Sequence, residues 1–273
     1  MSSIVKSRPF LPMFHALWNY RSFIAGSVKR EFQLKYRNSI LGAAWTFLNP
    51  LAMIIVYTVI FSQIMRMKLP EVDSTFAYSI YLCAGLLTWG LFAEITTRAQ
   101  NIFLENANLL KKINFPRLCL PVTVVAGAGL NFAIIFGLFT CFLILSGNFP
   151  GWTYLALLPV LAVQIAFAIG LGIVIGVLNV FFRDVGQLFT VVLQFWFWLT
   201  PIVYPISILS ERVRGMIAFN PMTQLMAAYQ TILVTGQWPD WISLWPVTAL
   251  ALLLCSWGML LFRRSAGEMV DEL

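Results

Sequence analysis

The polar and charged side chains best placed to engage a partner lie together in one stretch, from Asn106 to Pro121. It reads NANLLKKINFPRLCLP and is the longest polar interruption between the apolar segments of the chain. Asn106 or Asn108 could cap a short helix whose last turn holds Lys111 and Lys112, where cations favour the helix dipole. Two prolines then end this helix and begin the next apolar run. The stretch therefore predicts a basic helix outside a membrane, joined closely to a span on each side.

Side chains for catalysis or ion coupling are scarce in the rest of the sequence. The single histidine, His15, lies in an amphipathic segment, and the four cysteines show no metal-binding or redox spacing. The acidic residues Glu94 and Asp184 stand at the ends of predicted spans, whereas ion-coupled carriers use buried ionisable groups. No phosphate-binding G-x-x-x-x-G-K-[ST] motif occurs. We therefore expect no catalytic site, no metal site and no cofactor bound by this chain. If the protein does transport work, the energy must come from another chain.

The composition is that of a polytopic membrane protein. Of the 273 residues, 60% are hydrophobic and only 11% are charged, compared with about 25% charged residues in a soluble domain. The formal net charge of +7 then indicates membrane orientation and not nucleic-acid binding.

The N-terminal segment, residues 1–42, is expected to be cytoplasmic. Residues 1–44 contain seven basic side chains and one acidic side chain, Glu31. Within residues 13–37 a helical stripe of apolar side chains predicts an amphipathic helix in the lipid headgroup region. Phe23 and Leu34 fall on the opposite face, where a protein contact and irregular burial are both open. The stripe comprises Phe14, Leu17, Trp18, Ile24, Val28, Phe32 and Tyr36.

Six apolar segments predict an all-α protein with a six-span transmembrane domain at residues 43–264. Residues 216–238 lack charge and could form a seventh span, but Asn220-Pro221 interrupts them, and a seventh span would place Arg263-Arg264 outside. Residues 206–240 therefore predict short re-entrant helices on the outer face. Residues 265–273 form a cytoplasmic tail. The expected spans are about 43–65, 76–93, 118–145, 152–182, 185–203 and 241–262.

The distribution of basic residues predicts the orientation of these spans. With six spans, one side receives the seven basic residues of the N-terminal segment, four in the Asn106 region and its approach, Arg183, and the pair Arg263-Arg264. The other side receives the remaining four of the 18 basic residues. Because basic loops stay in the cytoplasm, both termini are expected to be cytoplasmic.

Two further patterns concern the interior of the spans. Gly170, Gly172 and Gly176 permit close helix contact, either within one subunit or at a seam between subunits. Aromatic side chains gather near span ends, where they form an interfacial belt or, because flat apolar rings suit sugar rings, line a path for sugar. The residues proposed for such a path are Trp89, Phe92, Trp196, Trp198 and Tyr204.

Four segments together resemble the permease subunit of polysaccharide-exporting ABC transporters, and most closely the lipopolysaccharide O-antigen type. In chain order they are KREFQLKYRNSILGAAWTFLNP (29–50), NANLLKKINFPRLCLP (106–121), FRDVGQLFTVVLQFWFWLTPIVYP (182–205) and FNPMTQLMAAYQTIL (219–233). The resemblance covers nearly the whole chain.

This resemblance implies a homodimer in the bacterial inner membrane that pairs with two copies of a separate ATPase, which carries ATP and Mg. The cargo is implied to be a polysaccharide on an undecaprenyl diphosphate carrier, moved from cytoplasm to periplasm. Residues 13–37 are implied to be an interface helix, 106–117 a coupling helix and 206–238 outer gate helices. The residues implied to contact the ATPase or to support that contact are Glu105, Asn106, Asn108, Leu109, Lys111, Lys112, Phe115, Pro116, Arg117, Arg183 and Asp184.

Other functions stay open at this point. Permeases that export teichoic acid or capsule share these motifs, so the polymer is less closely defined than the mechanism. A lipid-linked sugar flippase working without an ATPase is a further alternative. A membrane glycosyltransferase would need a metal or carboxylate site, which the sequence does not offer.

Overall fold

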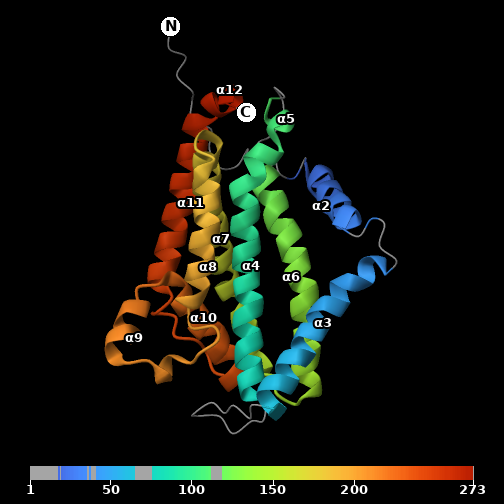
Figure 1. Cartoon of the computed structure of the whole chain (residues 1–273), viewed down its shortest axis with the longest axis vertical. Coiled ribbons are helices and arrows are strands. Elements are labelled where there is room, and N and C mark those ends of the chain that lie inside the picture. Colours follow the sequence, from blue (N-terminus) through green and yellow to red (C-terminus); the bar gives the residue numbers. More distant parts are fainter. Residues whose placement is uncertain are drawn as a thin grey trace.

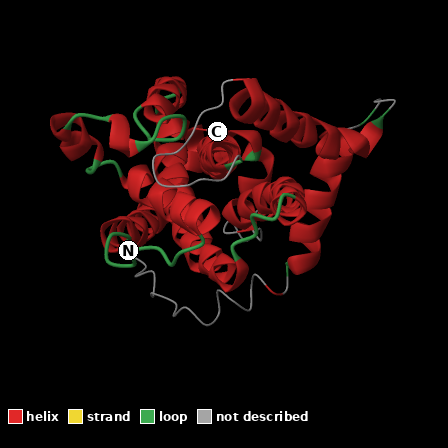
Figure 2. Ribbon diagram, turned by 90° about the horizontal axis from the view of Figure 1, so that it is seen from below, coloured by secondary structure: helices red, strands yellow, loops and turns green. Residues whose placement is uncertain are grey.

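The chain is described by a computed structural model, which covers residues 18, 20–35, 37, 41–64, 76–111 and 119–272. These described residues form helices and connecting loops and include no strand, as Figure 2 shows. The long helices lie side by side as a bundle, with the short helices gathered at its two ends (Figure 1). The expected all-α class is therefore confirmed for the described residues.

Four helices in the described ranges are long and apolar enough to cross a membrane. They are α4 (Ala77–Glu105), α6 (Cys119–Leu145), α7 (Leu157–Phe181, extended at its start by the 3₁₀ turn η3, Gly151–Ala156) and α11 (Trp245–Ser265). The other two expected spans are shorter as α-helices. The count of six spans thus stays a prediction.

The first and fifth expected spans depart from regular α-helix. A 3₁₀ turn, η1 (Gly42–Ala44), leads into α3 (Trp45–Tyr57), which contains Pro50 and continues as the π-helical η2 (Thr58–Ile64). α8 (Asp184–Trp198) is about 22 Å long at 1.5 Å per residue, less than the roughly 30 Å of a hydrocarbon core. It ends before Thr200-Pro201, because proline lacks the amide needed to continue the helix.

The second expected span continues well beyond its predicted end at Ala93. α4 is a single helix from Ala77 to Glu105, about 43 Å long. Glu94 is expected at the end of this span but lies inside α4, eleven residues before the end of the helix at Glu105, which corrects that expectation. Charged residues did not end the helix because Glu and Arg are good helix formers and nothing in this region breaks the backbone pattern.

Part of the predicted N-terminal amphipathic helix is described as α2 (Arg21–Lys35). Ile24, Val28 and Phe32 from the predicted apolar stripe are half-buried and face α6 across a groove. Phe14, Leu17 and Tyr36 lie outside the described residues. None of the side chains of α2 is fully buried, so the helix lies on the surface of the bundle.

Small residues bring the central helices α4, α7 and α11 together. A Cβ added at Gly172 would collide with Ala99 of α4, and one at Gly176 would lie 2.6 Å from the Ala99 carbonyl oxygen. A Cβ at Gly170 would lie 2.8 Å from the Cys255 nitrogen of α11. Of the two roles left open for these glycines, close packing within one subunit is therefore the one that the structure shows.

The short helices divide between the two ends of the bundle. Figure 1 draws α5 (Ala107–Leu110), α12 (Glu268–Glu272) and the α7–α8 connection at one end, and α9 (Glu211–Ile217) and α10 (Pro221–Gln230) at the other. α10 starts at Asn220-Pro221, where the Asn220 side chain accepts a hydrogen bond from the Met222 amide at 3.0 Å. The remaining turns of this segment are η4 (Ile206–Ile208) and η5 (Thr231–Thr235).

Candidate coupling end and candidate sugar path

The predicted basic helix is described only in part, as the single turn α5 directly after α4. Asn106 occupies its N-cap position but does not cap it, since its side-chain amide donates to the Ile102 carbonyl at 2.9 Å. Its neighbours Glu105, Asn108 and Lys111 are exposed, Leu109 is half-buried, and Leu110 is buried and anchors the turn. Lys112, Phe115, Pro116 and Arg117 lie outside the described residues. The exposed polar side chains form a surface that a partner can contact.

The α7–α8 connection lies at the same end of the bundle as α5 (Figure 1). Arg183 and Asp184 are both exposed there. Asp184 is the first residue of α8, where a carboxylate interacts favourably with the positive end of the helix dipole. The structure thus places the two predicted supporting residues at the same end of the bundle as α5.

A buried asparagine, which the sequence reasoning missed, connects this turn to α4. Asn179 of α7 donates to the Gln100 carbonyl of α4 at 3.0 Å and accepts from the Gly186 amide of α8 at 3.0 Å. Its side chain is almost fully buried. The sequence does indicate a role for Asn179, because it stands within an apolar run and a buried polar group in a span is costly unless it is hydrogen-bonded.

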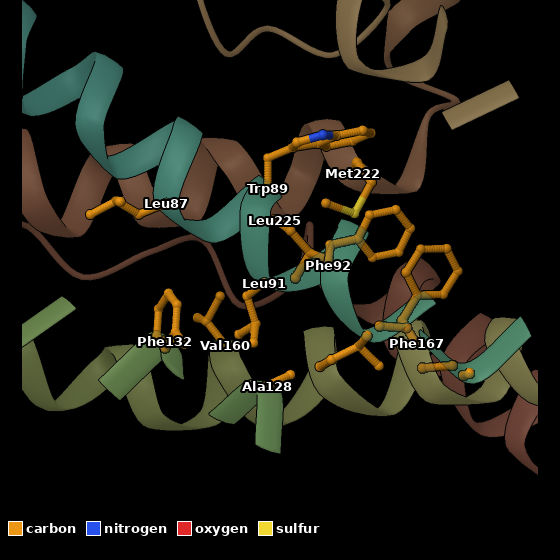
Figure 3. Close-up of a cluster of buried hydrophobic side chains, with 14 of the residues drawn as sticks. Leu87, Trp89, Leu91, Phe92, Ala128, Phe132, Val160, Phe167, Met222 and Leu225 are labelled. Atoms are coloured by element: carbon orange, nitrogen blue, oxygen red, sulfur yellow. The ribbon is translucent and has the colours of Figure 1, made fainter. Parts of the chain in front are cut away.

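Three of the five predicted path residues belong to an aromatic cluster inside the protomer. Trp89 and Phe92 of α4 are buried, and Figure 3 shows them beside Phe167 of α7. Phe92 stacks on Phe167 at 5.5 Å between ring centroids, and Trp196 of α8 meets Phe92 edge-on at 5.3 Å. The Trp196 indole nitrogen donates to the Asn220 side chain at 2.7 Å. These contacts make the cluster a packing centre that joins α4, α7 and α8.

The other two predicted path residues are more accessible. Trp198 is 61% exposed, so it points away from the cluster that Trp196 enters, as their spacing on a helix predicts. Tyr204 is half-buried, and its hydroxyl donates to the Trp198 carbonyl at 2.9 Å. Burial raises the pKa of the Tyr204 phenol, so it stays a neutral donor. Whether these rings meet sugar stays a prediction.

The irregular loop after α8 is held by side chains from the N-terminal end of α4. The Tyr78 hydroxyl donates to the Val203 carbonyl at 2.6 Å, and the Tyr81 hydroxyl donates to the Tyr204 carbonyl at 2.9 Å. Gln230, the last residue of α10, donates to the Pro201 carbonyl at 3.0 Å. Backbone carbonyls that no helix satisfies are thus paired, as a low-dielectric surrounding requires. α4 therefore contacts the α8–α10 loop at one end and carries α5 at the other.

Comparison with known proteins bears on what this arrangement does. Residues 24–234 match the family model described as ABC-2 type transporter. An O-antigen export system permease protein, RfbA, from Myxococcus xanthus is 31% identical over 94% of this chain and 97% of the relative. A protein of the same name from Klebsiella pneumoniae is 29% identical over 76% of this chain and 78% of the relative. The polysialic acid transport protein KpsM of Escherichia coli is 21% identical over 89% of this chain and 93% of the relative.

Proposed function

Because the chain belongs to the ABC-2 type transporter family, we propose that it is the permease subunit of an ATP-driven exporter of lipid-linked polysaccharide in the bacterial inner membrane. The polymer we propose is O-antigen, since the relatives with that name are more similar to this chain than the polysialic acid transporter. Export of capsule or teichoic acid is the second candidate, and the KpsM similarity favours capsule of the two.

The observation that carries the proposal is the continuity of α4. A single helix of about 43 Å runs from the tyrosines that hold the α8–α10 loop to the start of α5. A regular helix transmits displacement along its axis, so a force on α5 reaches the loop at the opposite end. Such a connection suits a transporter whose energy source is bound at one face and whose exit lies at the other.

The partners and orientation follow from this proposal. We assign α5, with Arg183 and Asp184, to the contact with a separate ATPase that holds ATP and Mg, and both termini to the cytoplasm. The functional unit is then a homodimer with two ATPase copies, and this chain does no catalysis. The aromatic residues Trp198 and Tyr204 are the accessible candidates for the sugar path, because Trp89 and Phe92 are buried in the protomer.

The test is export by the purified complex in proteoliposomes. Permease and ATPase are reconstituted with a lipid-linked polysaccharide, and ATP-dependent transfer of the polymer across the bilayer is measured. Reversal of Lys111 and Lys112 to Glu should abolish transfer or loosen ATPase binding while the permease remains inserted. Reversal of Arg212 and Arg214 of α9, also a basic pair but at the opposite end, is the matched control. Transfer by permease alone would favour the ATP-independent flippase and contradict the proposal.

A further inference from the structure

A chain of polar contacts joins α2 to the bundle through Arg98 of α4. One guanidinium nitrogen of Arg98 donates to Glu31 Oε2 of α2 at 2.6 Å, and the other donates to Glu94 Oε1 at 3.3 Å. The second oxygen of Glu94 accepts from the Asn131 amide of α6 at 2.9 Å. These four side chains therefore connect α2, α4 and α6.

The backbone of α6 leaves room for this arrangement at Gly127. A Cβ added there would lie 2.9 Å from Nη2 of Arg98 and 3.2 Å from Oε2 of Glu31. A side chain at this position would require the Arg98 guanidinium to shift from its place beside Glu31. The guanidinium is thus seated between two carboxylates and a glycine, and the Arg98 side chain is only 26% exposed.

The remaining attachment of α2 is incomplete. A groove of about 710 Å³ separates part of α2 from α6, and Ile24, Val28 and Phe32 line it without being fully buried. Because no side chain of α2 is fully buried, its apolar packing against the bundle is weak. The Glu31–Arg98 ion pair adds a directional contact that such packing lacks.

Arg98 lies close to the α5 end of α4, so the Glu31–Arg98 ion pair connects α2 to that end of the helix. Glu105 is the last residue of α4, directly before the turn that leads into α5. Arg98 lies seven residues earlier, a distance of about 10 Å along the helix. No helix break separates the two positions. A displacement of α4 at its α5 end must therefore move Arg98, and with it whatever Arg98 holds.

We propose that Arg98 is a positioning residue that makes α2 follow the movement of α4 during export, with Glu31 as its contact on α2. This inference rests on the proposed function, since it supposes that α5 receives force from an ATPase. Glu94 and Asn131 orient the guanidinium from the bundle side. When the pair is broken, α4 moves without α2, and ATP hydrolysis continues with less polymer transferred.

The first experiment measures the position of α2 without any transport. Val28, which faces the groove, is changed to Cys after removal of the native cysteines, and its labelling by a water-soluble maleimide is timed in proteoliposomes. Glu31→Gln should speed labelling several-fold, because α2 leaves α6 more often. Arg30→Gln, an exposed neighbour on the same helix, should leave the rate unchanged. Equal rates in the parent and Glu31→Gln would overturn the inference even if the complex exports normally.

The second experiment is a double-mutant cycle on the complete complex, with export and ATP hydrolysis measured per permease in the membrane. Glu31→Gln should lower export about fivefold or more while hydrolysis is retained. Because Glu31 acts through Arg98, Glu31→Gln should cost nothing further in an Arg98→Gln background. The inference would be overturned if the double variant lost export by the product of the two single-variant factors. It would also be overturned if export fell only in proportion to the membrane level of the permease or to ATP hydrolysis. Absence of export by the parent complex would instead contradict the proposed function, and the labelling result would still decide the α2 contact.

Discussion

The amide of Gly186 donates a 3.0 Å hydrogen bond to the side-chain oxygen of Asn179, and a Cβ at Gly186 would lie 2.6 Å from that same oxygen. The first turn of α8 is thus held against α7 by a contact that only glycine permits. Since Asn179 also donates to α4 at Gln100, one buried side chain connects three helices at the α5 end of the bundle.

Asn179→Ala should destabilise the protein and loosen the start of α8. The change leaves the Gly186 amide, in the first turn of α8, without its partner, and a buried unsatisfied group costs about 1–3 kcal/mol. The Gln100 carbonyl loses only a second hydrogen bond, because it lies inside α4 and keeps its helical partner. Thermal unfolding of the detergent-purified protein measures the loss. Gln194→Ala, an exposed amide on α8, serves as the control and should unfold near the parent temperature. Equal unfolding temperatures for the two variants would show that the Asn179 hydrogen bonds contribute little to stability.

Gly176→Ala should separate α4 from α7. The added methyl group would lie 2.6 Å from the Ala99 carbonyl oxygen, and overpacking of this kind typically costs about 1–3 kcal/mol. Gly137→Ala on α6 is the matched control, because nothing lies within 4 Å of its added Cβ. Membrane level and thermal stability should fall for the first variant only. A stable Gly176→Ala protein would contradict the close α4–α7 contact.

Phe92→Ala and Trp198→Ala should affect different properties. Phe92 is fully buried among aromatic rings, so its truncation should cost about 3–5 kcal/mol and lower the amount of folded protein. Trp198 is mostly exposed, so its truncation should leave stability nearly unchanged. If Trp198 lines the sugar path, export per permease should fall in that variant. Unchanged export would assign Trp198 to contact with lipid.

Cysteine labelling from outside the cell should reach the α9–α10 end of the bundle. Ser210 is exposed before α9, and Gln237 is exposed after η5. Gly236 is a poorer position, because its φ of +66° is strained for any other residue. With native cysteines replaced, an impermeant maleimide should label Ser210→Cys and Gln237→Cys but not Ser265→Cys at the end of α11. Labelling of Ser265→Cys in intact cells would reverse the proposed orientation.

Most of the helical elements were predictable from patterns in the chain. Long apolar runs place α6, α7 and α11 within a few residues of their observed bounds, because lipid-facing and buried helix surfaces are both apolar. The start of α10 at Asn220-Pro221 was marked as a break by the proline. The family resemblance, carried by ordered motifs, is confirmed by the match over residues 24–234.

The contacts that the charged side chains of α4 make were decided by tertiary structure. Hydropathy places the end of a span at Ala93 because Glu94 and Arg98 are charged. Both are good helix formers, so α4 continues to Glu105, and only the fold shows that their side chains contact Asn131 and Glu31. No local pattern could pair Glu31 with Arg98, since 67 residues separate them in the chain.

The roles of the aromatic residues show the same division. Composition and spacing predict that Trp196 and Trp198 point to different sides of a helix, because successive residues turn by about 100°. Which of the two enters the core depends on where α4 and α7 lie, since Phe92 and Phe167 supply the rings that Trp196 contacts. Helix formation is local and readable from the chain, whereas burial is a property of distant segments brought together.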